Sequence, residues 1–180
     1  MVHIAYARRP LARKSTPMRL HTLGENSFEG YASLFDRPDG AGDVVAPGAF
    51  AGSLRRHGAG AVRMLYQHFA HTPIGVWDVI REDATGLYVR GTLVDEVETA
   101  RDVRALLAAG ALNGLSIGFR TARAQRRPGG GRRLLEVELW EISVVTFPLL
   151  AGSRVTAIGT RGGEPGLAEV FRQAGAAMRA

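Results

Sequence analysis

Residues 134–147, LLEVELWEISVVTF, form the longest strand pattern of the chain and decide its fold class. Apolar and polar residues alternate through the first half, as in a strand with one face on a core. The polarity of the two faces shifts near residues 139–141, so either the sheet is buried on both sides there or a bulge exchanges the faces. Both alternatives put Glu141 among apolar residues.

The segment before this strand contains an apolar run and then an arginine-rich stretch. LNGLSIGF, residues 112–119, is punctuated by Gly114 and Gly118, and glycine inside a strand marks a bulge or a close backbone approach. Residues 120–133 hold six arginines around PGGG and no acidic residue. Because nothing there can form a core, the pattern predicts a mobile loop or an extended hairpin tip.

The rest of the chain adds short strands and a few helices. In residues 62–68, Val62, Met64, Tyr66 and His68 share one face of a predicted strand, so His68 ends an apolar row. A meander is predicted from two further strands before a helix over about 97–109. The other predicted strands are 28–35, a short one within 43–48, 74–80 and 86–94; the other helices are 49–57 and an amphipathic one from Leu167 to Met178.

Length and composition limit the possible classes of protein. The chain has 180 residues, enough for one domain with tails, and its 23 glycines and 8 prolines favour turns and short strands. It contains no cysteine, which excludes disulfides, thiolate-held zinc and a cysteine nucleophile. No stretch approaches the length of about 18 apolar residues needed to span a membrane, so we expect a soluble protein with no membrane partner.

The net charge of +6 is unevenly placed. Residues 1–24 hold five basic residues and no acid, whereas residues 25–180 hold 18 basic and 17 acidic residues. The excess therefore belongs to a leader, which argues against a dedicated nucleic-acid-binding domain. We expect a basic flexible leader at 1–24, one domain at 25–158, and a glycine-rich linker with a short amphipathic helix at 159–180.

Hydroxyl chemistry is one covalent route that the composition leaves open. Ser116 needs a neighbouring base and a third group that fixes the base, and His68 and Glu141 would fill those roles. The glycines beside Ser116 would free backbone amides to stabilise an oxyanion. From spacing alone, the more ordinary interpretation is a small strand residue at 116 and a structural histidine at 68, and Glu141 could equally be an acid paired with a nearby arginine.

A metal site is the competing interpretation of the histidines. His68 and His71 could converge on zinc together with Asp78 or Glu141. Pro73 argues against a helix that would fix this pair, so the spacing of the two histidines is only a weak indication of a metal site.

Six segments in a fixed order carry a family resemblance from about Phe28 to Val155. They are FEGYASLFD, GDVVAPGAFAGSL, LYQHFAHTPIGVW, GLYVRGTL, LNGLSIGF and LWEISVVTFPLLAGSRV. In this combination the chain resembles the prohead proteases of tailed bacteriophages and gene transfer agents, serine peptidases related to herpesvirus assemblins.

The resemblance implies a mainly β fold with flanking helices, a compact β-barrel. It implies a serine endopeptidase without a cofactor, with Ser116 as nucleophile, His68 as general base and Glu141 as the third member. His71 is the alternative third member, and Phe69 stands where the family often has an acid. The implied partners are the major capsid protein precursor with its scaffold segment, the enzyme itself as a further substrate, and other copies in a homo-oligomer. The implied place is the assembling procapsid in the bacterial cytoplasm.

Two other function classes remain open at this point. A non-catalytic capsid-assembly or nucleic-acid-binding barrel would keep its function without the Ser116 hydroxyl. A metal hydrolase built on His68 and His71 would lose activity with a chelator, to which a serine mechanism is indifferent. The arginines of 120–133 suggest, from charge alone, a tether to an acidic scaffold or to packaged nucleic acid.

Overall fold

The structure is a computed structural model that describes residues 23–159. Most of the predicted leader and the predicted C-terminal helix therefore lie outside the described residues. The strands of the described part begin at Ser27 and end at Ile158.

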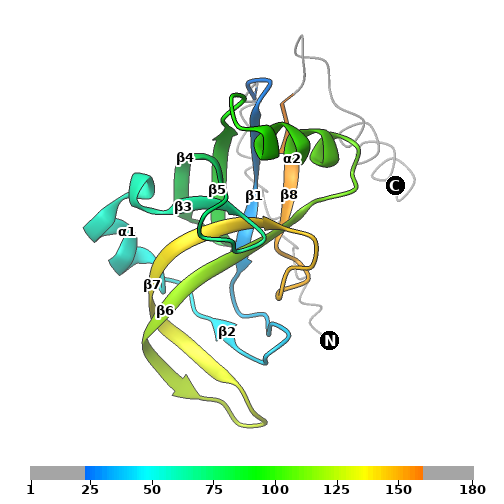
Figure 1. Ribbon diagram of the computed structural model, residues 1–180. Helices are drawn as coiled ribbons and strands as arrows, with labels where there is room; N and C mark the ends of the chain where they lie inside the picture. Colours follow the sequence, from blue (N-terminus) through cyan, green and yellow to red (C-terminus); the bar gives the residue numbers. More distant parts are fainter. Residues whose placement is uncertain (1–22, 160–180) are drawn as a thin grey trace, which may run out of the picture.

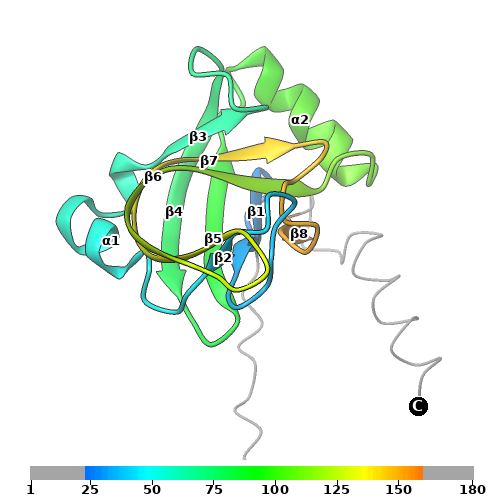
Figure 2. The ribbon, with the colours of Figure 1, turned by 90° about the horizontal axis from the view of Figure 1, so that it is seen from below.

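Eight strands of the described chain form one sheet, and seven of them close into a barrel in the order β7-β3-β4-β5-β1-β8-β6 (Figure 1). The pairing of β6 with β7 completes the ring, which is seen from below in Figure 2. The strands are β1 Ser27–Leu34, β2 Val44–Val45, β3 Arg63–Tyr66, β4 Pro73–Glu82, β5 Gly86–Leu93, β6 Gly114–Arg126, β7 Arg132–Val145 and β8 Arg154–Ile158.

Two α-helices of the described residues flank the barrel, α1 Ala51–His57 and α2 Glu98–Ala108. A short 3-10 helix, Ala59–Ala61, follows α1. Helix α2 lies across one end of the barrel, at the top of Figure 1, and buries an apolar stripe of Ala100, Val103 and Leu107. The predicted class, mainly β with flanking helices, is confirmed.

The core fills the barrel with side chains that alternate inward along each strand. Phe28 and Trp77 meet edge to face with ring centroids 5.6 Å apart. Around them lie fully buried aliphatic side chains of the central strands, Met64, Ile74, Leu87, Val89, Leu115, Ile142 and Val144. Burial of this set is the main force that holds the barrel wall, and with it any site on that wall, in one arrangement.

The β6–β7 hairpin is much longer than the barrel needs and projects below it (Figure 1). Both arms continue through the arginine-rich stretch, so the hairpin alternative holds and only residues 127–131 form the tip. The register shifts where Gly118 pairs with Glu141 and Phe119 pairs with Leu139, which leaves Trp140 as the extra residue of a bulge. The bulge explains the change of faces, and beyond it residues 142–145 are buried on both sides of the sheet, so both alternatives are present.

Two local features differ from the predictions. Residues 154–158, for which no strand was predicted, form β8 and pair with β1. His68 does not end strand 62–68, since β3 stops at Tyr66 and the chain turns there. The described chain contains no helix long and apolar enough to cross a membrane.

Candidate active site

A tight turn at the end of β3 presents His68. The Phe69 N–H donates to the Tyr66 carbonyl at 3.0 Å, and the two central residues, Gln67 and His68, have φ values of 53° and 62°. A four-residue turn with positive φ at both centres is of the type I′ kind, which usually employs glycine or asparagine. Two larger residues in this conformation are strained, so surrounding contacts must hold the turn.

Hydrogen bonds to the end of β7 and to Thr146 supply those contacts. The Gln67 N–H donates to the Val144 carbonyl at 3.0 Å, which extends the parallel β3–β7 pairing by one residue. The Gln67 side-chain amide donates to Thr146 Oγ1 at 2.7 Å and accepts from the Thr146 N–H at 3.3 Å. Gln67 therefore fixes the turn that carries His68.

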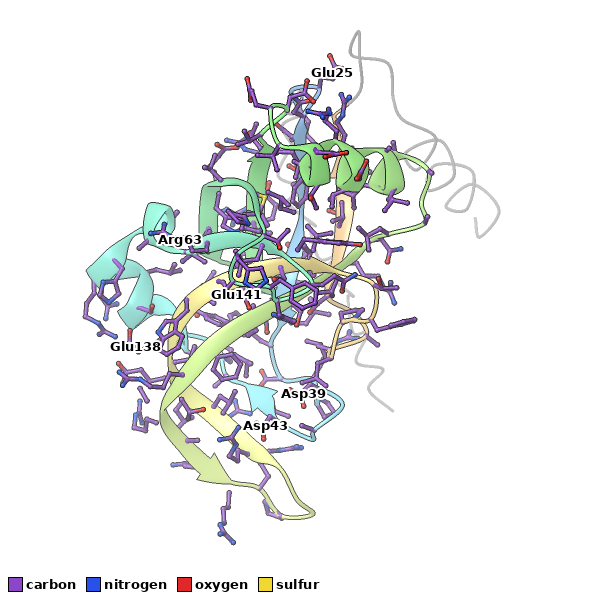
Figure 3. The ribbon with its side chains drawn as sticks, viewed as in Figure 1. Glu25, Asp39, Asp43, Arg63, Glu138 and Glu141 are labelled. Atoms are coloured by element: carbon purple, nitrogen blue, oxygen red, sulfur yellow. The ribbon has the colours of Figure 1, made fainter. Side chains whose placement is uncertain are left out.

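Sheet register brings the other two predicted residues to the same place. Ser116 of β6 pairs with Ser143 of β7, and Ser143 pairs in turn with Leu65 of β3. Glu141 lies two residues from Ser143 on the same face of β7. Figure 3 labels Glu141 on β7 and its register partner Arg63 on β3.

Three side chains form a continuous chain of hydrogen-bond contacts. His68 Nε2 lies 2.9 Å from Ser116 Oγ, and His68 Nδ1 lies 2.6 Å from Glu141 Oε1. The Glu141 side chain is 14% exposed and that of His68 is 45% exposed, so the carboxylate is shielded while the imidazole is open to a substrate. With its proton on Nδ1 facing Glu141, the imidazole can accept the Ser116 proton at Nε2.

A fourth residue, Ser143, links the members of this cluster. Its hydroxyl is fully buried, donates to Glu141 Oε2 at 2.7 Å, and accepts the backbone N–H of His68 at 3.1 Å. Ser143 thus holds both the carboxylate and the strained turn. Sequence reasoning missed it, although its alternation with Glu141 along one strand face was the available signal.

Residues 14–165 match the family model described as the caudovirus prohead serine protease. The chain belongs to this family. The match spans most of the chain and includes every strand of the barrel. The resemblance noted in the sequence is therefore confirmed.

A family relative and two solved structures give the range of similarity. The prohead protease of Enterobacteria phage HK97 is 40% identical over 124 residues, which make up 67% of this chain and 55% of that protein. The matched part thus spans about half the length of the relative. The bacteriophage T4 capsid assembly protease has a TM-score of 0.54 at 11% identity, covering 66% of this chain and 80% of that one. The KSHV protease has a TM-score of 0.47 at 11% identity, covering 72% of this chain and 63% of that one. The T4 likeness supports the barrel fold.

In this prohead-family chain, the two glycines around Ser116 lie within β6, and the close backbone approach and the bulge that the sequence predicted there are both present. A Cβ at Gly118 would come within 2.1 Å of Glu141 Oε1, and one at Gly114 within 2.5 Å of the Val145 carbonyl oxygen. Gly118 therefore makes the space in which the Glu141 carboxylate reaches His68.

The residues of the competing metal interpretation do not gather. His71 stacks on the Phe69 ring at a centroid distance of 6.2 Å, and Asp78 accepts a hydrogen bond from Thr92 at 2.8 Å. Among the described residues, no group of three or more histidine, aspartate or glutamate side chains could hold a metal ion. His71 is also not among the recorded contacts of Ser116 or Glu141 in this part of the chain.

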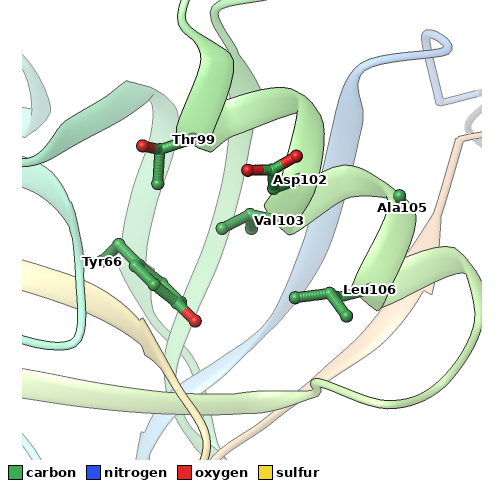
Figure 4. A pocket seen from close by; sticks show the side chains of 6 residues that line it. All are labelled: Tyr66, Thr99, Asp102, Val103, Ala105 and Leu106. Atoms are coloured by element: carbon green, nitrogen blue, oxygen red, sulfur yellow. The ribbon is translucent and has the colours of Figure 1, made fainter.

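Two hollows lie near the cluster. The larger, with an empty volume of about 700 Å³, lies between α2 and Tyr66 and is lined by none of the three predicted residues (Figure 4). The smaller is lined by Ser116 itself together with Leu115, Phe119, Leu149 and Leu150. Because Ser116 is one of its lining residues, the smaller hollow is the one that bears on chemistry at Ser116.

Proposed function

We propose that this chain is a serine endopeptidase that cleaves the capsid precursor with its scaffold segment during procapsid maturation. Residues 25–158 are its protease domain, with Ser116 as nucleophile, His68 as general base and Glu141 as the third member. The observation that carries the proposal is the chain of contacts from Ser116 Oγ through the imidazole to Glu141, at 2.9 and 2.6 Å. Family membership and the names of the HK97 and T4 proteins support the place of action.

The mechanism is acyl transfer. His68 Nε2 takes the Ser116 proton as Oγ attacks the scissile carbonyl carbon, and the imidazolium then protonates the leaving amine. Water, deprotonated by the same nitrogen, releases the acyl-enzyme and regenerates Ser116. Glu141 remains ionised, holds the Nδ1 proton and stabilises the imidazolium. No cofactor takes part in any of these steps.

Substrate binding uses the hollow that Ser116 lines. Its walls are largely apolar and include Leu115, Phe119, Leu149 and Leu150. We therefore expect a small or medium apolar side chain of the substrate to enter it beside the scissile bond. The exposed Phe69 and Phe147 on the loops next to His68 and after β7 offer further apolar contact.

Cleavage of the co-expressed precursor tests the proposal. Ser116→Ala and His68→Ala are expected to lower the rate by about 10⁶-fold and leave full-length precursor. His71→Ala is the matched control, because this exposed imidazole lies three residues from His68 outside the contact chain, and it should process normally. Normal processing by Ser116→Ala would contradict the proposal, and loss of processing in His71→Ala alone would reassign the base.

The same proposal covers the enzyme's own maturation and assembly. We expect self-cleavage, a homo-oligomeric state and action inside the procapsid within the bacterial cytoplasm. Intact-mass measurement of wild type against Ser116→Ala tests self-cleavage, which predicts a shorter wild-type chain only. Sedimentation of Ser116→Ala tests the homo-oligomer, which a monomer at all concentrations would contradict.

A further inference from the structure

The tip and the β7 arm of the long hairpin are fastened to the loop before β2. Arg132 Nη2 lies 2.5 Å from Asp43 Oδ2, and Arg133 Nη2 lies 2.8 Å from Asp36 Oδ1. Arg127 donates to the Gly42 carbonyl at 2.9 Å, and a Cβ at Gly131 would come within 2.0 Å of that same oxygen. Figure 3 shows Asp43 beside the hairpin. The hairpin is therefore a braced element and not a loose loop.

The β6 arm of the same hairpin carries three arginines that form no recorded hydrogen bond or ion pair within residues 23–159. They are Arg120, Arg123 and Arg126, and all three are exposed. The carboxylates opposite Arg120 and Arg123 on β7 are Glu138 and Glu136, and both contact Arg56 of α1.

Arg126 has no favourable neighbour across the ladder. It pairs in register with Arg132, and like charges directly opposite each other are destabilising. Residues 23–159 contain 15 basic and 15 acidic residues, so this charge is a local feature of one strand and not of the whole barrel. An anionic partner is what these three guanidinium groups lack.

The backbone of this strand is also available. β6 pairs with β7 as far as Arg126, but its other edge pairs with β8 only at Gly114, and the Leu115 N–H to the Ser153 carbonyl is the last bond there. From Arg120 to Arg126, no strand of the described chain pairs with that edge, which faces outward in Figure 1. An open strand edge is a template for an extended peptide.

We propose that the open edge of β6 from Arg120 to Arg126 docks an acidic segment of the substrate polypeptide as an added strand. The identity of that polypeptide rests on the proposed function, whereas the docking chemistry does not. Backbone hydrogen bonds align the segment, and its acidic side chains meet the arginines. The same arginines repel a second copy of this edge, which selects an acidic partner over self-pairing. The bracing of the tip and β7 arm means that little order has to be gained on binding.

Fluorescence anisotropy with the full-length Ser116→Ala chain tests the docking without cleavage. The probes are a labelled peptide of alternating glutamate and valine and its lysine-for-glutamate counterpart. We expect the acidic peptide alone to bind, with affinity that falls as salt rises. The combined variant Arg120→Gln, Arg123→Gln, Arg126→Gln should weaken binding by about tenfold. The combined variant Arg55→Gln, Arg90→Gln, Arg101→Gln loses the same charge elsewhere and should bind as before.

Backbone-methylated probes separate strand addition from simple charge attraction. One probe carries methyl groups on the odd-numbered peptide nitrogens and the other on the even-numbered ones. Only every second N–H of an added strand points at β6, so one probe should lose binding and the other should keep it. Equal binding by both methylated probes would overturn the added strand. An equal loss of binding in the two combined arginine variants would overturn the site. Tighter arginine-dependent binding of a DNA duplex than of the acidic peptide would replace the polypeptide partner with nucleic acid. Because Ser116→Ala cleaves nothing, failure here leaves the proposed peptidase untouched, and failure of precursor cleavage leaves the docking result standing.

Discussion

The two halves of the β6–β7 hairpin differ in what surrounds them. On the barrel side of the Trp140 bulge, β7 is paired on both edges, by β6 and by β3, and its Glu141 and Ser143 are held by His68 and by each other. On the far side, the β6 arm has one open edge and arginines without partners. One pair of strands thus offers a fixed geometry suited to chemistry and an open, charged edge suited to recognition.

The difference shows how position in a fold changes what the same kind of residue can do. In the barrel-side half, which contains Ser116, burial makes each hydrogen bond more important for stability, because a polar group that loses its partner there cannot bond to water instead. In the far half, which carries the exposed arginines, solvent weakens the interaction of each charge, so that several charges must act together to bind a partner. The variants below separate the two halves.

Among the variants that compare the two halves, the largest effect is expected from Glu141→Gln. The amide keeps the size of the side chain but cannot hold the Nδ1 proton or stabilise the imidazolium, so we expect the cleavage rate to fall by about 10⁴-fold. The measurement is the rate of precursor cleavage. The thermal midpoint and acidic-peptide binding should stay close to those of the parent protein. A rate within tenfold of wild type would remove Glu141 from the mechanism.

Gly118→Ala tests the space that the carboxylate occupies. The added Cβ would lie 2.1 Å from Glu141 Oε1, so the carboxylate must move away from His68. A misplacement of this kind is expected to cost about 10²-fold in rate. Gly60→Ala is the control, because no atom lies within 4 Å of a Cβ there. Equal activity of the two variants would show that the close approach at Gly118 has no catalytic consequence.

Ser143→Ala tests the link between Glu141 and the turn of His68. Loss of one hydrogen bond to a charged group predicts a fall in kcat of about tenfold or somewhat more, with KM unchanged. Ser53→Ala is the matched control, since the Ser53 hydroxyl is also buried and accepts a backbone N–H, from Leu139 at 3.0 Å. Both variants should lose about 1 kcal/mol of stability. A similar fall in kcat for both would make the role of Ser143 purely structural.

Asp43→Asn acts on the arginine half and is expected to leave the cleavage chemistry unchanged. The hydrogen bond from Arg132 lowers the pKa of Asp43, so its contribution to stability is present above its unfolded-state pKa and is lost as pH falls through the folded-state value. We expect the variant to lose about 2 kcal/mol at neutral pH, measured by urea unfolding. This difference should vanish in acid, and a difference that persists there would contradict the ion pair as its cause.

Much of the fold could be predicted because periodicity reports burial directly. The alternation in 134–147 and the stripe of Ala100, Val103 and Leu107 each gave the right element. The five residues of β8 lie between glycine-rich stretches and have no clear strand pattern of their own. They form a strand because they pair with β1, which is distant in the sequence. The positive φ of Gln67 and His68 was equally hidden, since neither residue type signals a left-handed turn.

The candidate site likewise contains residues that sequence motifs indicate and residues that only the tertiary structure reveals. His68, Ser116 and Glu141 could be named from motifs, although their distances could not. Ser143 was missed because a buried serine in a strand has no distinctive pattern, and its value depends on the turn that register brings to it. The close approach at Gly118 could be predicted, but not that a carboxylate fills its space, because Glu141 lies across the ladder.

Labelling of the nucleophile tests the central claim most directly. Diisopropyl fluorophosphate reacts with a serine activated by a neighbouring base, and peptide mapping by mass spectrometry locates the adduct. The account predicts a single adduct on Ser116 in the wild-type chain and a greatly slowed reaction in His68→Ala. A chain that cleaves its precursor while Ser116 stays unlabelled, or an adduct on Ser143 in place of Ser116, would contradict it.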